Sequence, residues 1–81
     1  MVKITFSLMF ERKLKKVNED FKIRIRKYIV KIIDNPEIGK PMRYNRKGTR
    51  EVYAGHFRLS YAYFQNEEKI IFLDVYHKDE Q

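Results

Sequence analysis

The stretch Phe57-Arg58-Leu59-Ser60-Tyr61-Ala62-Tyr63-Phe64 decides the fold, because large apolar side chains alternate in it with small or charged ones. Side chains two residues apart share one face of a β-strand. One face therefore carries large side chains, expected to pack against helices: Phe57, Leu59, Tyr61 and Tyr63. The other face carries Arg58, Ser60 and Ala62, which predicts a shallow open surface with a fixed cation in it.

Two further β-segments flank this stretch. Residues 49–54 are rich in β-forming side chains, and Gly55-His56 has the composition of a tight turn before the stretch. Residues 65–68 form the next turn. Residues 69–77 follow, with an apolar run typical of a central strand. The C-terminal half therefore predicts a meander of three antiparallel strands.

The N-terminal half predicts one strand and two helices. Residues 2–6 alternate as a short strand, and Ser7 is placed to cap a helix over about 8–16. Asn18 is placed to cap a second helix, which Asn35-Pro36 ends. We expect an α+β fold of two layers, with both helices on one face of a four-stranded sheet.

Two regions of this half lie outside the regular pattern. Ile23 and Val30 lie nearly opposite the main apolar stripe of the second helix. Packing against the first helix is the preferred interpretation, and a partner surface is the alternative. Residues 37–48 contain Gly39, Pro41 and Gly48 and are expected to form a basic loop.

Composition limits the classes of function. The 81 residues allow a single domain, 1–81, and without cysteine they exclude disulfides and thiolate metal sites. No apolar stretch is long enough to span a membrane, so we expect no membrane partner. A small secreted domain would often need disulfides, so the absence of cysteine favours a cytoplasmic location. The net charge of +7 predicts a polyanionic partner, such as nucleic acid or an acidic protein.

Two short motifs resemble those of a known family. The segment His56-Phe57-Arg58-Leu59-Ser60-Tyr61 resembles the Y-R-L-x-Y strand of the RelE/ParE toxin superfamily, and Val75-Tyr76-His77-Lys78 resembles the end of its last core strand. The order of the elements also matches over essentially the whole chain. The resemblance implies the toxin of a type II toxin–antitoxin pair.

RelE-like and YoeB-like members cut mRNA in the ribosomal A site without a metal or other cofactor, and their product carries a 2′,3′-cyclic phosphate. By this resemblance, Arg58 contacts the scissile phosphate, His77 is the acid or base, and Lys78 is a second cation. The same resemblance implies RNA binding by the basic segment before the central strands, with these candidates: Lys40, Arg43, Arg46, Lys47 and Arg50.

The chain also departs from the family pattern. Glu51 and Tyr53 stand where many members have basic residues, Lys40 falls near the general-base Glu of YoeB-like members, and the C-terminal Tyr of RelE-like members has no match. Glu51 could be a catalytic base with Tyr53 stacking on an RNA base. A cross-strand ion pair between Glu51 and Arg58 is the preferred interpretation.

Two other functions therefore remain open. ParE-like members of the superfamily poison DNA gyrase and cut no RNA. A catalytically degenerate toxin could instead persist as half of an autorepressing complex with its antitoxin. All three hypotheses imply an antitoxin, expected to be acidic and encoded next door, and they relate the toxin to DNA only through that antitoxin. The first hypothesis adds mRNA and the ribosome as partners.

Overall fold

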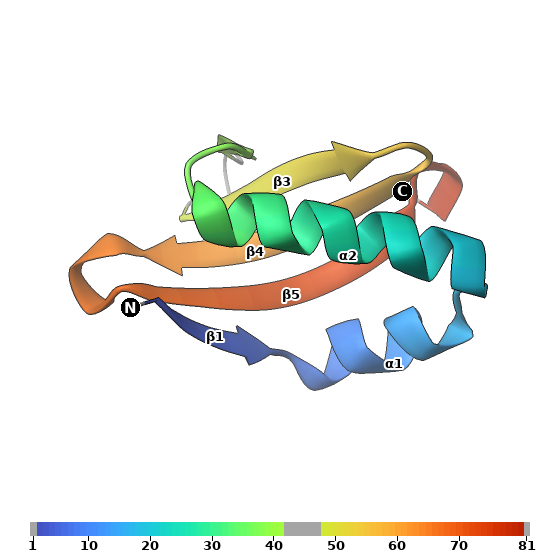
Figure 1. The fold of residues 1–81 in the computed structure, drawn as a ribbon, viewed down its shortest axis with the longest axis horizontal. Coiled ribbons are helices and arrows are strands. Elements are labelled where there is room, and N and C mark those ends of the chain that lie inside the picture. The colour runs from blue at the N-terminus through green and yellow to red at the C-terminus, as the bar shows by residue number, and fades with distance from the viewer. Residues whose placement is uncertain (1, 42–47, 81) are drawn as a thin grey trace.

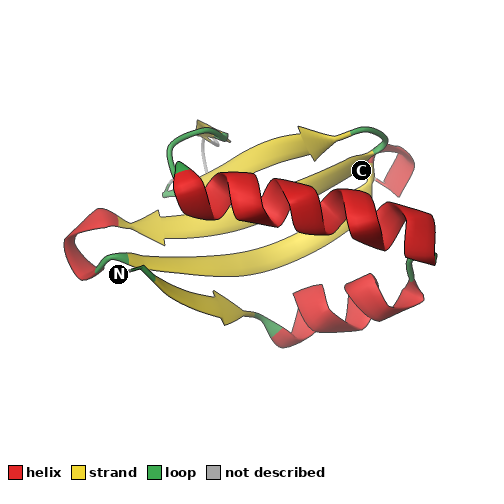
Figure 2. Cartoon of the chain, in the orientation of Figure 1, coloured by secondary structure: helices red, strands yellow, loops and turns green. Residues whose placement is uncertain are grey.

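The computed structural model describes residues 2–41 and 48–80. Its helices and strands follow in this order: β1 (Lys3–Phe6), α1 (Leu8–Lys16), α2 (Glu19–Asp34), β2 (Lys40–Pro41), β3 (Thr49–Ala54), β4 (Phe57–Phe64) and β5 (Lys69–His77). Two 3-10 helices, Gln65–Glu67 and Lys78–Glu80, follow β4 and β5. The strands form one sheet with the order β1-β5-β4-β3-β2, and α2 crosses one of its faces (Figure 1, Figure 2). The α+β class is confirmed.

Both helices begin at the predicted capping residues. The side-chain oxygen of Ser7 accepts a hydrogen bond of 3.0 Å from the Phe10 amide, and that of Asn18 accepts one of 3.0 Å from the Phe21 amide. Each cap satisfies one amide that the first turn of a helix cannot pair internally. The Ser7 hydroxyl also donates to the Leu73 carbonyl at 2.6 Å, which joins the start of α1 to β5.

The core lies between α2 and the sheet. Its fully buried side chains come from both helices and from the two central strands: Phe10, Ile25, Ile32, Leu59, Tyr61, Ile70, Phe72 and Val75. β1 runs parallel to β5, and the other neighbouring strands are antiparallel. The large side chains of β4 face the helices, as the alternation of the stretch predicts.

A β-bulge interrupts the pairing of β4 with β5. Ser60 pairs with Asp74 and Tyr61 pairs with Phe72, so Leu73 is an extra residue on β5. A bulge of one residue reverses which face the following side chains occupy. Core positions on β5 therefore change from even numbers (Ile70, Phe72) to odd ones (Val75).

The sheet has one more strand than the four predicted. Lys40 and Pro41 pair with Glu51 and Arg50 of β3 within the segment expected to be a loop. Proline cannot donate a ladder hydrogen bond and is tolerated at a sheet edge, which is where β2 lies in the described residues. A strand of two residues, one of them proline, is too short to show the alternation of side chains by which a strand is predicted from sequence.

The prediction that Ile23 and Val30 pack against the first helix is wrong. Their exposed fractions are 50% and 57%, because α1 packs along β5 and does not cover this side of α2. Their apolar side chains are left on the outer surface of α2. No helix in the described part of the chain is long and apolar enough to cross a membrane.

Candidate functional site

Four predicted or newly placed side chains meet on the sheet face opposite α2, which we call the open face. Tyr53 of β3 pairs across the strands with Arg58 of β4, and Arg58 pairs with Tyr76 of β5. Directly opposed residues share a face, so these three side chains form a row. Glu51 lies two residues before Tyr53 and therefore points to the same side.

Glu51 is the buried anchor of this row. Its exposed fraction is 4%, and among the described residues it is the charged residue that is buried. The Tyr76 hydroxyl donates to Glu51 Oε2, and Arg58 Nη1 lies 3.7 Å from Glu51 Oε1. The predicted ion pair between Glu51 and Arg58 is thus present. A buried carboxylate needs such partners, so Glu51 fixes the positions of the Tyr76 phenol and the Arg58 guanidinium.

Arg58 keeps donors available for a ligand. Its side chain is 24% exposed, and its guanidinium carbon lies 4.6 Å from the centre of the Tyr53 ring. The contact with Glu51 involves Nη1, whereas a guanidinium has five N–H donors in a fixed planar fork. Such a fork suits a phosphate group.

Lys40 extends the row to the sheet edge. It pairs with Glu51 in the register between β2 and β3, and its ammonium lies 5.6 Å from the centre of the Tyr53 ring. Tyr53 is 49% exposed. A half-exposed aromatic ring between two cations can stack on a nucleobase while the cations attract its phosphates.

Arg50 lies on the other side of β3 and is used structurally. Its Nη1 donates to the carbonyl of Glu37 at 3.1 Å and to that of Gly39 at 2.8 Å. The buried Tyr61 hydroxyl donates to the Pro36 carbonyl at 2.6 Å and accepts from the Gly39 amide at 3.0 Å. Burial raises the pKa of the Tyr61 phenol, against lowering contributions from the Gly39 amide and Arg50. This network fixes the backbone that leads into β2.

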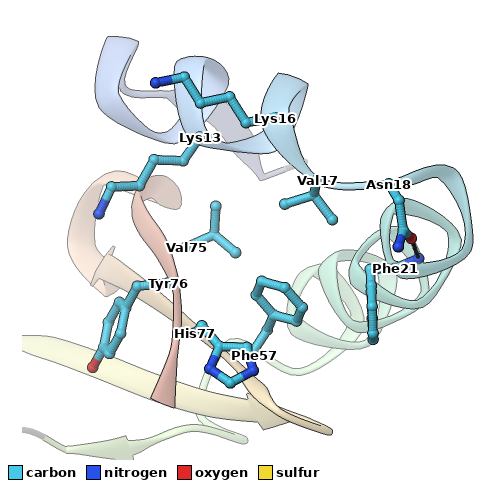
Figure 3. Close-up of a pocket in the computed structure, with 9 residues that line it drawn as sticks. All are labelled: Lys13, Lys16, Val17, Asn18, Phe21, Phe57, Val75, Tyr76 and His77. Carbon is cyan, nitrogen blue, oxygen red and sulfur yellow. Dashed lines mark hydrogen bonds between the residues drawn. The ribbon is translucent and has the colours of Figure 1, made fainter. Parts of the chain in front are cut away.

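His77 does not join the open face. It pairs with Phe57, whose ring packs against Phe21 of α2, so its side chain lies on the helix side of the sheet. Figure 3 shows His77 beside Phe57 and Tyr76 pointing away from both. The reversal at the Leu73 bulge is the cause, because an uninterrupted strand would exchange the faces of Tyr76 and His77.

The surroundings of His77 are partly polar. Its ring stacks on that of His56, with the ring centres 5.8 Å apart, and meets the Phe57 ring edge-on at 5.3 Å. The Asp79 amide lies 3.2 Å from His77 Nδ1, and the Asp79 carboxylate lies 3.3 Å from the same atom. His56 is exposed, and it lies in the turn between β3 and β4 that Gly55-His56 predicted.

The remaining predicted site residues fall into two groups. Lys78 is exposed in the 3-10 helix after β5, and its backbone amide donates to the His56 carbonyl. Arg43, Arg46 and Lys47 lie outside the described residues. Within the described ranges, no three histidine, cysteine or acidic side chains are grouped to hold a metal ion.

Sequence reasoning missed Tyr76. Tyr76 stands next to His77 in the strand-end motif, so the sequence did point to this part of the strand. The side of the sheet on which Tyr76 lies depends on the bulge, however, and could not be predicted. Arg58, Tyr53, Lys40, Glu51 and Tyr76 together can hold a phosphate, stack a base and pass a proton from a phenol to a carboxylate.

Comparison with known proteins gives a family and a fold. A sequence model of the ParE toxin of the type II toxin–antitoxin system parDE matches residues 4–81. No curated protein sequence matches the chain.

Among solved structures, the chain is similar to the toxin–antitoxin complex RelBE2 of Mycobacterium tuberculosis, with a TM-score of 0.85 and 23% identity over 94% of this chain and 96% of that one. The YoeB/ParE toxin of Agrobacterium tumefaciens gives a TM-score of 0.82 with 12% identity, covering 94% and 98% of the two chains. The isolated Escherichia coli RelE toxin gives 0.79 with 13% identity, covering 95% and 84%. The fold is therefore that of RelE-like toxins, and the chain belongs to the RelE/ParE family of type II toxin–antitoxin toxins.

Proposed function

We propose that this toxin is an mRNA endoribonuclease that acts on ribosome-bound message, and that the open face is its RNA site. The observation that carries the proposal is the row of Lys40, Tyr53 and Arg58 beside the hydrogen-bonded pair of Tyr76 and Glu51. Two cations, an exposed ring, a phenol and a carboxylate are the functional groups that RNA binding and proton transfer require.

The roles follow from what each side chain touches. Arg58 binds the scissile phosphate through the N–H groups that do not face Glu51. Tyr53 stacks on a neighbouring base, and Lys40 attracts the backbone beside it. Glu51 is buried, holds both Arg58 and Tyr76 in place, and can accept the proton of the Tyr76 hydroxyl.

The reaction would use the nucleophile of the RNA itself. The 2′-oxygen forms a bond to the neighbouring phosphorus as the bond to the 5′-oxygen breaks, leaving a 2′,3′-cyclic phosphate. Tyr76 accepts the 2′-hydroxyl proton while its own proton passes to Glu51, the leaving 5′-oxygen takes up a proton from solvent water, and Arg58 neutralises the charge that develops on the phosphate. This assignment transfers the acid–base role from His77 to Tyr76, because His77 lies on the opposite side of the sheet from Arg58.

Primer extension on message translated in a reconstituted system tests the proposal. The purified toxin should produce new 3′-ends only when ribosomes are present, and EDTA-treated toxin returned to the same buffer should cut equally well. Intact message at an excess of toxin would exclude the function. A Tyr76→Phe variant should keep the fold and lose most of the cleavage.

A second candidate, ParE-like inhibition of DNA gyrase, is favoured by one specific observation. Arg58 already has a carboxylate partner, and the histidine expected beside it lies on the other face. A protein-binding toxin needs no convergent acid and base. Gyrase-dependent DNA breaks, with uncut mRNA in the same preparation, would favour this candidate. Absence of both effects would leave a toxin that only binds its antitoxin.

We also propose an acidic antitoxin as the partner. Two of the similar structures, RelBE2 of Mycobacterium tuberculosis and RelE–RelB of Pyrococcus horikoshii, are complexes with an antitoxin. The net charge of +7 on this chain favours a negatively charged partner. Co-expression with the neighbouring reading frame should restore growth if that frame encodes the antitoxin.

A further inference from the structure

The open face has a carboxylate on β5 as well as on β3. Asp74 pairs with Ser60 of β4, and Ser60 pairs with Glu51 of β3. Directly opposed residues share a face, so the side chains of Asp74 and Glu51 point to the same side of the sheet. Neighbouring strands lie about 4.8 Å apart, so β3 and β5 are about 10 Å apart. The two carboxylates therefore stand at separate places on the open face.

Each of these carboxylates has a cation beside it. The one at Glu51 is Arg58, as described above. The one at Asp74 is Lys13 of α1, whose ammonium lies 2.9 Å from Asp74 Oδ1. Because α1 packs along β5, its lysine reaches the open face from beyond that strand. The open face therefore carries two pairs of a carboxylate and a cation.

The ammonium of Lys13 adjoins the residue to which we assign proton transfer. It lies 6.0 Å from the centre of the Tyr76 ring. Figure 3 shows the ends of Lys13 and Tyr76 on the same side of β5, whereas Phe57 and His77 lie on the other side. A ligand that reaches Tyr76 on the open face therefore also comes within reach of Lys13.

Lys13 keeps donors available for such a ligand. Asp74 Oδ1 is shielded from solvent and accepts no aligned hydrogen bond from the described residues, so its contact with Lys13 is one of charge. An ammonium has three N–H donors on a rotatable bond, and the Lys13 side chain is 39% exposed. A phosphate oxygen that approaches from solvent can accept from it.

Lys13 also completes an alternation of cations and rings across the sheet. Starting from the edge at β2, the order is Lys40, Tyr53, Arg58, Tyr76 and Lys13. A single strand of nucleic acid presents phosphates and bases in alternation, and proteins bind it with a basic track and aromatic rings. The row matches such a strand on both sides of the central arginine.

We infer that Lys13 forms a second phosphate subsite of the open face, which binds the backbone phosphate next to the scissile one on the side away from Lys40. Arg58 binds the scissile phosphate, Tyr53 stacks on a base on one side of it, and Lys13 holds the backbone on the other. Contacts to phosphate fix the register and orientation of a strand without reading its sequence. The inference rests on the proposed RNA cleavage.

The first test measures single-turnover cleavage of message on ribosomes stalled at one codon, so that one phosphate is cut. Lys13→Gln should lower the rate at limiting toxin by about three- to ten-fold. At saturating toxin the change should be about two-fold or less, because Arg58 and Tyr76 stay in place. Lys13→Arg keeps the charge and should stay within about two-fold of the native chain.

Lys16→Gln is the matched control for Lys13→Gln. It removes the same charge one turn further along α1, where the side chain is exposed and extends away from Tyr76 (Figure 3). A charge that acts only over a distance is screened by salt, so its removal should change the rate at limiting toxin by about two-fold or less.

Messages in which one phosphate is replaced by an uncharged methylphosphonate locate the contact. The loss caused by Lys13→Gln should disappear when the replaced phosphate adjoins the scissile one on one side, and should persist when it adjoins it on the other. If the native toxin cuts no message, the proposed function and the inference both fail. If the native toxin cuts, equal losses in Lys13→Gln and Lys16→Gln, or a Lys13→Gln loss that is the same with every message, would overturn the inference alone.

Discussion

Arg58 and His77 lie near the same end of the sheet, yet their surroundings differ in kind. Arg58 lies on the open face between Tyr53 and the buried Glu51, where cations, a ring and a carboxylate are in contact. His77 lies on the helix side, against Phe57 and next to an apolar groove. One face has the groups that a phosphate requires, whereas rings and aliphatic side chains predominate on the other. The comparison teaches that the two sides of one sheet end differ in chemistry, one charged and polar and the other mainly apolar.

The largest expected effect is on the buried carboxylate that organises the open face. Glu51→Ala removes the acceptor of the Tyr76 hydroxyl and the partner of Arg58, so the free energy of unfolding should fall by about 3 kcal/mol. Chemical denaturation measures it. Glu67→Ala, a matched change at an exposed position, should leave stability almost unchanged. Equal stability of the two variants would show that Glu51 does not hold the open face together.

The network that leads into β2 should show the next largest effect. Tyr61→Phe leaves the Pro36 carbonyl and the Gly39 amide without their partner, and this should cost about 2 kcal/mol of unfolding free energy. Tyr63→Phe, on the same strand and the same face, has no such network and is the control. If both variants unfold at the same denaturant concentration, the network does not stabilise the entry to the open face.

A smaller effect is expected from the exposed ring between Lys40 and Arg58. Tyr53→Leu should weaken the binding of short RNA by roughly ten-fold, because it removes a stacking surface worth about 1–3 kcal/mol per base. Fluorescence anisotropy with labelled RNA measures this. Tyr28→Leu is the control, since Tyr28 also lies under a lysine, Lys31, but on α2. RNA binding that depends equally on Tyr28 would move the RNA site away from the open face.

The smallest effect is a pH dependence from Tyr61. Burial raises the pKa of this phenol in the folded state, so the unfolded chain loses its proton first as the pH rises. The stability contribution is complete below the ordinary tyrosine pKa of about 10 and declines above it. Denaturation from pH 8 to pH 11 should show a steeper alkaline loss in the native chain than in Tyr61→Phe. Parallel curves would rule out this contribution.

The sequence was sufficient for most of the fold. The β-forming residues of 49–54, the alternation in β4 and the apolar run of 69–77 correctly predicted three strands, and the capping residues Ser7 and Asn18 both helix starts, because these signals are local. β2 was missed, since two residues including Pro41 have no periodicity. The exposure of Ile23 and Val30 was also missed, because it depends on where α1 packs.

The arrangement of the candidate site was harder to predict from the sequence than the fold. The pair of Glu51 and Arg58 could be predicted, since both lie on neighbouring strands whose turn fixes the register. The faces of Tyr76 and His77 could not, because they depend on one extra residue, Leu73, in the pairing of β4 with β5. The run Ile70-Ile71-Phe72-Leu73 is apolar on both faces, so it does not reveal where the side that faces the core changes.

The most direct test of the account compares Arg58→Ala with His77→Ala in ribosome-dependent mRNA cleavage, after both variants are shown to be folded. We predict that Arg58→Ala lowers the cleavage rate by at least about 100-fold, since it removes the phosphate-binding cation, whereas His77→Ala changes it by only about two-fold. Arg58→Lys should be intermediate. A loss in His77→Ala as large as that in Arg58→Ala would contradict the assignment of the chemistry to the open face.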